Sequence, residues 1–382
     1  MSTNIRLFYP VLLASAFTFG AFAAQAETFG ILHTFTGAPD GAYPVYNELT
    51  LDKGKLYSTT PNGGDADAGV VFQLTTQGKE KVLYTFTGGT DGANPNGGVL
   101  RDPATGNIYG TAAAGGDAGN GVLFRLKKNG AYTVLHNFDG TDGQAPIGSL
   151  VRDEAGNLFG VAMAGGETSA GTVFEWTAGG EFHVVHEFNG NDGAGPSATL
   201  TRDSSGNLYG VTQFGGDDGF GNIFKIASDG TFTTLYSFTG GNDGGNPQGG
   251  LARDAEGNLY GTATYDGAHG KGIVYRLKPN GKFSLLYTFL GADDGQYPTG
   301  DLLRTDTGDL YGTTSYGGGS PGNGTAWRLS TKGKFALLHS FGGGEADGAY
   351  PHAGLIQAGR DKYYGIAHSG GGGAGIVYSL TK

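Results

Sequence analysis

Residues 243–289 read DGGNPQGGLARDAEGNLYGTATYDGAHGKGIVYRLKPNGKFSLLYTF, and this stretch decides the fold. It holds four short runs that favour β-strands, at 250–253, 258–262, 272–277 and 283–289. Turn residues separate the runs, and Asn280-Gly281 is a strong hairpin signal. Four evenly spaced strands joined by turns are typical of one blade of a β-propeller.

The same unit recurs along the chain. Its fourth run closes on a phenylalanine, and successive phenylalanines lie 50 to 52 residues apart: Phe35, Phe86, Phe138, Phe188, Phe238, Phe289 and Phe341. An Asp-Gly-x-x-Pro motif follows each of them, with its aspartate at Asp40, Asp91, Asp142, Asp192, Asp243, Asp294 and Asp347. The sequence therefore predicts an all-β, seven-bladed β-propeller with four antiparallel strands per blade.

The two ends of the repeat array complement each other. Residues 29–35 match the fourth strand of a unit, and residues 375–380 match the third. We therefore expect the N-terminal strand to complete the C-terminal blade, which would remove the open edge of a linear array.

Composition and charge limit the class of protein. Glycine makes up 76 of 382 residues, but 23 Phe and 20 Tyr argue against a disordered linker. The formal net charge is −11 and no basic run occurs, so nucleic acid is not an expected partner. Cysteine is absent, so no disulfide can form.

The first 26 residues are typical of a secretory signal peptide. Arg6 precedes a short apolar segment, and Ala24-Gln25-Ala26 has the form that signal peptidase accepts. We expect cleavage after Ala26, a single propeller domain over residues 27–382, and a secreted or periplasmic location. No later segment is apolar enough to predict a membrane span.

The unit resembles the Gloeobacter/Verrucomicrobia-type repeat of exported bacterial proteins, also called the GloVer repeat. The residues that carry the resemblance are 156–160, Gly165-Gly166, 171–174 and the Asp-Gly-x-x-Pro motif. This resemblance implies a propeller-like repeat protein and says little about activity. The first unit departs from the pattern, with one extra residue after Pro44 and Ser58 where the other units have glycine.

Aromatic residues gather at two loop positions that we expect on one rim of the ring. They precede the Gly-Gly pair of the second loop or the proline of the motif, and they are Tyr43, Phe214, Tyr265, Tyr297, Tyr316 and Tyr350. Exposed rings beside polar residues suit the faces and hydroxyls of a sugar. The sequence thus gives a candidate glycan- or peptide-binding rim, with packing between blades as the alternative explanation.

The seven motif aspartates invite a metal hypothesis, but a structural role explains them better. An aspartate before glycine accepts backbone N–H bonds and fixes a turn, whereas a calcium loop needs several oxygen ligands together. We therefore expect no metal and no cofactor. His352 and His368 are the histidines placed to act as a general base, and no catalytic motif accompanies them.

These features favour a monomeric, non-catalytic binding scaffold whose partner is a carbohydrate or a peptide. A polysaccharide lyase or hydrolase is the alternative if the chain is an enzyme, a point that the sequence leaves open. A structural component of the envelope or matrix is the third possibility.

Overall fold

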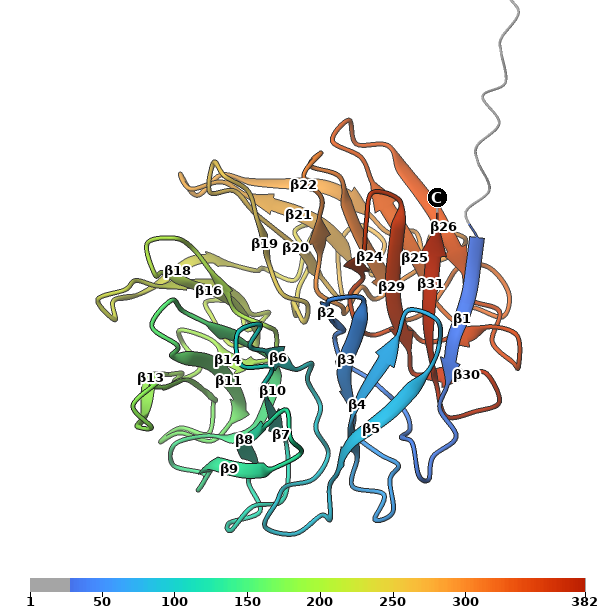
Figure 1. Cartoon of the computed structure of the whole chain (residues 1–382). Coiled ribbons are helices and arrows are strands. Elements are labelled where there is room, and N and C mark those ends of the chain that lie inside the picture. The colour runs from blue at the N-terminus through green and yellow to red at the C-terminus, as the bar shows by residue number, and fades with distance from the viewer. Residues whose placement is uncertain (1–27, 382) are drawn as a thin grey trace, which may run out of the picture.

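The computed structural model describes residues 28–381. Its regular secondary structure in this part of the chain consists of β-strands. The strands form seven antiparallel blades arranged in a ring (Figure 1). The predicted seven-bladed propeller is therefore confirmed. The expected signal peptide, residues 1–26, lies outside the described residues.

Blades 1 to 3 follow one another along the chain. Blade 1 contains β2 (Thr50–Asp52), β3 (Lys55–Thr60), β4 (Val70–Thr75) and β5 (Glu80–Thr85). Blade 2 contains β6 (Leu100–Arg101), β7 (Ile108–Ala112), β8 (Val122–Leu126) and β9 (Tyr132–Asn137). Blade 3 contains β10 (Gln144–Arg152), β11 (Leu158–Ala164), β12 (Thr172–Trp176) and β13 (Phe182–Glu187).

Blades 4 to 6 repeat this order, although the first strand of blade 4 is split in two. Blade 4 contains β14 (Ala194–Pro196), β15 (Thr201–Arg202), β16 (Leu208–Phe214), β17 (Asn222–Ile226) and β18 (Phe232–Ser237). Blade 5 contains β19 (Ala252–Arg253), β20 (Leu259–Ala263), β21 (Ile273–Leu277) and β22 (Phe283–Thr288). Blade 6 contains β23 (Leu303–Arg304), β24 (Leu310–Thr314), β25 (Thr325–Leu329) and β26 (Phe335–Ser340).

Blade 7 is built from both ends of the described chain. Its strand order is β1 (Thr28–Thr34), β31 (Ile376–Thr381), β29 (Lys362–Ala367) and β28 (Ile356–Gln357), and a short pair, β27 (Gly348–Ala349) and β30 (Ser369–Gly370), lies beside it. β1 runs antiparallel to β31, with Ile31 opposite Tyr378. The predicted clasp between the N-terminal and C-terminal strands is therefore confirmed, and both strands lie side by side in Figure 1.

The first strand of each blade is the innermost. β2 lies against β6, and β19 lies against β23, so neighbouring first strands meet around the axis. The phenylalanine that closes each fourth strand is at most 1% exposed in all seven blades. Each blade is therefore covered by its neighbours, which explains why the strands do not alternate between apolar and polar residues.

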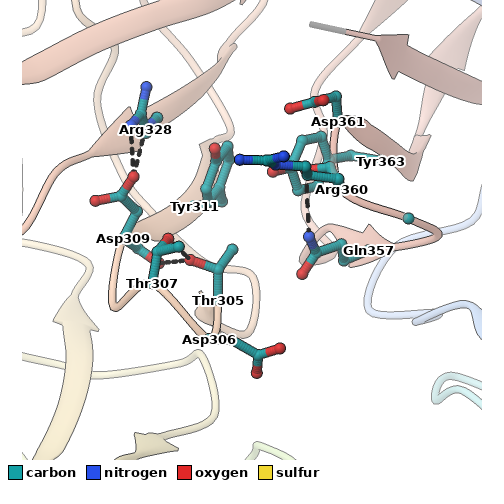
Figure 2. A pocket seen from close by; sticks show the side chains of 11 residues that line it. Thr305, Asp306, Thr307, Asp309, Tyr311, Arg328, Gln357, Arg360, Asp361 and Tyr363 are labelled. Atoms are coloured by element: carbon teal, nitrogen blue, oxygen red, sulfur yellow. Dashed lines mark hydrogen bonds and ion pairs between the residues drawn. The ribbon is translucent and has the colours of Figure 1, made fainter.

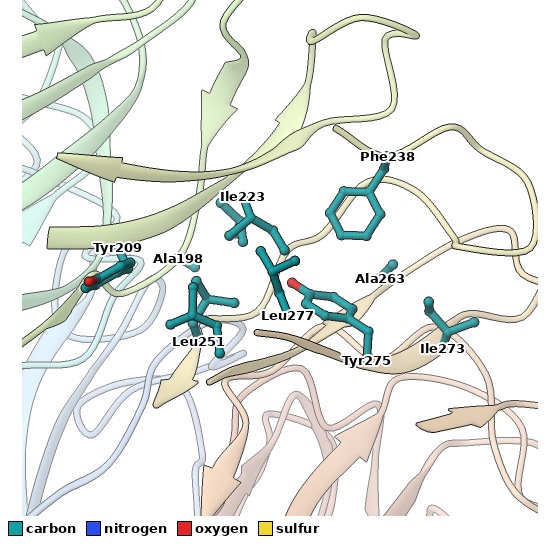
Figure 3. Packing of buried hydrophobic residues seen from close by; sticks show 11 residues of the cluster. Ala198, Tyr209, Ile223, Phe238, Leu251, Ala263, Ile273, Tyr275 and Leu277 are labelled. Carbon is teal, nitrogen blue, oxygen red and sulfur yellow. The ribbon is translucent and has the colours of Figure 1, made fainter. Parts of the chain in front are cut away.

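The seam between blades 4 and 5 illustrates this packing (Figure 3). Ile223 and Phe238 of blade 4 belong to one buried cluster with Leu251, Tyr275 and Leu277 of blade 5. The Phe238 and Tyr275 rings meet edge to face, with centroids 5.3 Å apart. Removing such a buried ring costs about 3–5 kcal/mol in comparable cores.

The Asp-Gly-x-x-Pro loop ties each blade to the preceding one. The residue before the proline donates its backbone N–H to a carbonyl of the neighbouring blade, as Asn246 does to Phe220 at 2.7 Å and Tyr43 to Ala374 at 2.7 Å. The proline packs over a glycine of the same neighbouring loop, and no side chain would fit at that glycine. The repeated motif is therefore a joint between blades.

Among residues 28–381, no helix is long and apolar enough to cross a membrane.

Candidate functional site

Two sets of loops form the rim around one mouth of the central channel. The loop that carries the motif is bridged to the loop between the second and third strands, for example by Gly245 with Tyr265 and by Gln296 with Tyr316. All six aromatic residues that the sequence singled out belong to these loops or their flanking strand ends. The bridges therefore hold these residues on one side of the ring.

Each motif aspartate is engaged within its own loop. Asp243 accepts hydrogen bonds from the backbone N–H of Thr239 at 3.0 Å and from the Tyr236 hydroxyl at 2.9 Å. The same pairing of a fourth-strand His or Tyr with the motif carboxylate occurs in every blade: His33–Asp40, Tyr84–Asp91, His136–Asp142, His186–Asp192, Tyr236–Asp243, Tyr287–Asp294 and His339–Asp347. A fourth-strand position that accepts either Tyr or His thus supplies a hydrogen-bond donor as well as packing.

The hydrogen bonds in the loop of Asp243 shift the pKa values of the groups that they join. Burial alone would raise the pKa of the Asp243 carboxyl, but hydrogen bonds from Thr239 and Tyr236 outweigh it and hold the pKa below its usual value. Burial and the same carboxylate raise the pKa of the Tyr236 phenol. Within residues 28–381, no three His, Asp or Glu side chains lie together as a metal-binding group. The motif aspartates thus hold their own loops through these hydrogen bonds.

Five of the six aromatic residues form an arc, which we call the tyrosine ladder: Tyr265, Tyr297, Tyr316, Tyr350 and Tyr43. The first four follow one another with ring centroids 5.1, 6.1 and 5.2 Å apart. His368 connects the arc to Tyr43, because its N–H donates to the Tyr350 carbonyl and its ring lies 5.4 Å from the Tyr43 ring. The ladder spans blades 5, 6, 7 and 1.

The ladder remains open to solvent despite these contacts. Tyr43, Tyr265 and Tyr316 expose 43%, 44% and 43% of their surface, whereas Tyr297 and Tyr350 are half-buried. Phe214 is also exposed, at 48%, but it lies on blade 4 against Gly195 and outside the ladder. Packing between blades therefore accounts for only part of each exposed ring.

The backbone under the ladder is strained. Tyr43, Tyr297 and Tyr350, each directly before a motif proline, have φ angles of 53°, 59° and 57°. Such left-handed angles favour glycine or asparagine and are unusual for a bulky residue. The other four blades place Asn94, Ala145, Gly195 and Asn246 at this position, with left-handed angles as well. A strained tyrosine in three consecutive blades is therefore a reason to look for function there.

Two carboxyl groups meet at the axis, which sequence reasoning did not predict. Glu48 and Asp301 precede the first core leucine of their blades, where the other blades have Gly98, Ser149, Thr199, Gly250 and Gly354. The two carboxyl groups line the same small cavity, and Asp301 accepts the Gly250 N–H at 2.5 Å. Burial, reinforced by the neighbouring Asp301, raises the pKa of Glu48 well above its usual value, and burial raises that of Asp301.

Two positions at which the first unit differs from the repeat lie near this carboxyl pair. The extra residue after Pro44 places Tyr46 at the mouth, where its hydroxyl donates to the Gln248 side chain at 3.3 Å. The Ser58 hydroxyl donates to the Glu48 carbonyl at 2.7 Å. The irregularities of unit 1 thus shape the wall around Glu48.

His352 lies in the same cavity as Glu48 and Asp301. Burial and the nearby His368 lower the pKa of His352 to about 4, so the ring is neutral at pH 7. Its Nδ1 is 2.9 Å from the Ser315 hydroxyl. Burial also lowers the pKa of His368, whose ring centroid is 5.9 Å from that of His352.

A cavity of about 750 Å³ lies on the opposite rim, between blades 6 and 7 (Figure 2). Tyr311 and Tyr363 stack in its wall with centroids 4.5 Å apart. Asp309 holds Arg328 in an ion pair at 2.5 Å, and Arg360 lies over the pocket. Arg360 therefore lies on the rim opposite His352 and His368. It cannot act together with these two histidines in one catalytic site.

The repeat has a known counterpart. A family model described as the Gloeobacter/Verrucomicrobia repeat matches residues 17–203 and, in a second overlapping match, residues 101–320. The chain belongs to this repeat family. The resemblance noted in the sequence is thereby confirmed for most of the chain. No curated protein sequence matches this member of the family.

Solved structures share the fold at low sequence identity. The extracellular domain of a protein named as a one-component system of B. thetaiotaomicron has a TM-score of 0.55 and 10% identity, over 93% of this chain and 40% of that chain. A protein named as a 6-phosphogluconolactonase of Bacteroides fragilis has a TM-score of 0.53 and 17% identity, over 82% and 86%. A similarly named protein of Bacteroides uniformis has a TM-score of 0.50 and 16% identity, over 78% and 84%. At such identities the similarity shows the propeller fold alone.

Proposed function

We propose that this member of the repeat family is an exported, non-catalytic propeller that binds a glycan across the tyrosine ladder. The observation that carries the proposal is that three tyrosines occupy left-handed backbone positions in consecutive blades, while the rings of Tyr43, Tyr265 and Tyr316 stay more than 40% exposed. The left-handed angle itself belongs to the joint between blades, but the other blades fill this position with Asn, Ala or Gly. A bulky tyrosine there, next to exposed rings, offers no evident gain in stability, so a ligand is the better reason for the choice of residue. The features of residues 1–26 that are typical of a signal peptide support the export in this proposal.

The mouth offers both kinds of contact that a saccharide uses. Aromatic faces pack on the C–H faces of a sugar ring, and polar side chains bind its hydroxyls. Asp266 follows Tyr265 directly, and the Gln248 amide lies beside Tyr46. The Asp266 carboxylate borders the ladder, and the Lys271 ammonium lies 5.5 Å from the centre of the Tyr297 ring, so one charge of each sign stands there. Because the chain as a whole carries a net charge of −11, we expect a neutral saccharide here.

Hydrolysis of a polysaccharide is the competing function, and the axial carboxyl pair is the observation that favours it. The geometry argues against the usual mechanism. On the side of the mouth, Glu48 and Asp301 line a cavity of only about 10 Å³, which has room for about one water molecule. A glycosidase binds its sugar between the two catalytic carboxyl groups, and a sugar does not fit into this cavity.

A carbohydrate-binding screen tests the proposal. The purified protein is titrated calorimetrically with neutral oligosaccharides and with unrelated peptides, and reducing ends are assayed in the same samples. The double variant Tyr265→Ala/Tyr316→Ala should weaken saccharide binding about 100-fold, since each stacked ring contributes roughly tenfold. Leu285→Ala/Leu337→Ala is the matched control, because these leucines are exposed to 46% and 43% on fourth strands away from the mouth.

Binding that survives loss of both tyrosines would remove the ladder from the function. Release of reducing ends that depends on Glu48 and Asp301 would support the hydrolase instead. Binding of peptides alone would change the ligand class, and binding of neither ligand would favour a structural role in the envelope or matrix.

A further inference from the structure

A cleft of about 330 Å³ lies between blades 1 and 2, on the rim opposite the tyrosine ladder. Five cationic side chains line it, and we call it the basic cleft: Lys55, Lys81, Arg101, Lys127 and Lys128. Its apolar wall comes from Leu83, Ile108 and Leu126, and none of its lining residues is Asp or Glu. The cleft is of the size that small-molecule sites have.

This concentration of positive charge runs against the chain as a whole, which has 24 Lys and Arg against 35 Asp and Glu. It does not come from the repeat either. The residues equivalent to Lys81 are Thr133, His183, Thr233, Ser284 and Ala336. The residues equivalent to Lys128 are Ala178, Ser228, Pro279 and Thr331. Lys81 and Lys128 are therefore particular to this seam.

Two of the five cations are committed to neighbours within the protein. Arg101 forms an ion pair with Asp52 and lies 5.0 Å above the Tyr57 ring. Lys55 donates to the Gln73 side chain at 3.4 Å. Within residues 28–381, none of the ion pairs includes Lys81, Lys127 or Lys128. Three of the lysines that line the cleft thus have no acidic partner among the described residues.

Gly106 leaves space for the side chain of Lys128. A side chain at Gly106 would come within 3.2 Å of Lys128 Cδ, so the glycine leaves room for the lysine stem to lie along the wall. The head group then stays near the cleft while the stem packs on protein. Like charges held at one site repel each other, and an anion would remove that cost.

We propose that the basic cleft binds an acidic saccharide unit through its carboxylate, as a uronic acid would present it. Lys81 and Lys128 bind the carboxylate, because an ammonium group donates charge-assisted hydrogen bonds to it. The amides of Gln73 and Asn129 are placed in the lining to bind hydroxyls, and the Leu83 and Ile108 side chains contact the C–H groups. The site is independent of the tyrosine ladder, which lies on the other rim.

Calorimetry with tetragalacturonate tests the inference, with maltotetraose and inorganic phosphate as comparison ligands. We expect the acidic tetrasaccharide to bind, maltotetraose to be inert at this site, and binding to weaken as salt rises, because salt screens exposed charges. Lys81→Gln/Lys128→Gln should weaken binding about tenfold or more. Lys332→Gln/Lys334→Gln is the matched control, since it removes the same charge from an exposed hairpin of blade 6.

Several results would overturn the inference. One is an acidic tetrasaccharide that does not bind, or that binds equally well to the two double variants. Another is inorganic phosphate binding as tightly as the saccharide, which would mark a general anion site. Tyr265→Ala/Tyr316→Ala distinguishes the two proposals, because it should weaken neutral saccharide binding at the mouth about 100-fold and leave binding of the acidic saccharide unaffected.

Discussion

Six seams of the ring carry a stacked pair that the seventh lacks. At the six seams an aromatic residue that opens the fourth strand lies flat on the His or Tyr of the neighbouring blade, with centroids 3.6 to 4.5 Å apart: Tyr84–Tyr132, His136–Phe182, His186–Phe232, Tyr236–Phe283, Tyr287–Phe335 and His339–Phe29. At the seam between blades 7 and 1, Glu80 occupies the position of the aromatic ring.

Glu80 is poorly accommodated at that seam. Its Oε1 is buried without a hydrogen-bond partner, and burial together with the nearby Asp40 raises the pKa of Glu80 to about 7. Ser58, the extra residue before Glu48, and Lys81 belong to the same first unit. The departures from the repeat are thus concentrated in the first unit, next to the blade that both ends of the described chain build.

The largest expected effect tests whether the clasp blade is as firmly packed as the others. Phe35 is 1% exposed and meets the Phe72 ring at 5.2 Å, as Phe188 meets Phe224 at 5.3 Å in an ordinary blade. Phe35→Ala and Phe188→Ala should each lower the free energy of unfolding by about 3–5 kcal/mol. Urea denaturation measures both. A much smaller loss for Phe35→Ala would mean that the clasp frays independently of the ring.

A second prediction concerns the residue that blade 1 has in place of glycine. Ser58 is fully buried and its hydroxyl donates to the Glu48 carbonyl at 2.7 Å. Ser58→Gly brings the unit closer to the repeat, yet it should destabilise the protein by about 1–2 kcal/mol, because a buried hydrogen bond is lost and glycine is unfavourable in a strand. Ser58→Ala separates the two contributions. Unchanged or higher stability of Ser58→Gly in thermal unfolding would contradict a structural role for the hydroxyl.

The smallest effect should come from restoring the missing ring. Glu80→Phe should stabilise the protein by about 1 kcal/mol through the stacked pair with His33. The gain should depend on pH. The folded-state pKa of about 7 lies above the ordinary 4.5, so the folded protein holds a proton that the unfolded chain releases, and wild-type stability falls as pH rises from about 5 through 7.

Thermal unfolding at pH 5 and pH 8 measures this dependence. The melting temperature of Glu80→Phe should exceed that of the wild type by more at pH 8 than at pH 5. Phe232→Glu, at the equivalent position of blade 4, is the reciprocal control and should lower stability most at high pH. An equal gain at both pH values would show that Glu80 titrates normally.

The fold could be predicted from the sequence because the same pattern of strands and turns occurs seven times along the chain. It also predicted the clasp between residues 29–35 and 375–380 and placed the aromatic residues in the loops of one rim. The left-handed tyrosines and their stacking could not be predicted, because φ angles and ring contacts depend on the neighbouring blade. Whether Tyr265 and Tyr316 bind a ligand stays a prediction.

The carboxyl pair at the axis was missed for a different reason. Glu48 and Asp301 lie far apart in the sequence, and only the closed ring brings blades 1 and 6 to a common axis. A signal was available, since both residues occupy the same position of the unit, directly before the first core leucine. The hydrogen bonds of the motif aspartates to His or Tyr were missed likewise, although both residue types offer a donor.

The joint made by the Asp-Gly-x-x-Pro loop has a consequence for how such proteins can arise. Every unit carries the backbone N–H that bonds to the preceding blade, as that of Asn246 bonds to the Phe220 carbonyl. It also carries the carbonyl and the glycine that receive the loop of the following blade. A duplicated stretch of about 50 codons would therefore insert a blade whose two attachments are already encoded. The number of blades can change by gene duplication without new bonding chemistry, until the curvature of the circle sets the limit.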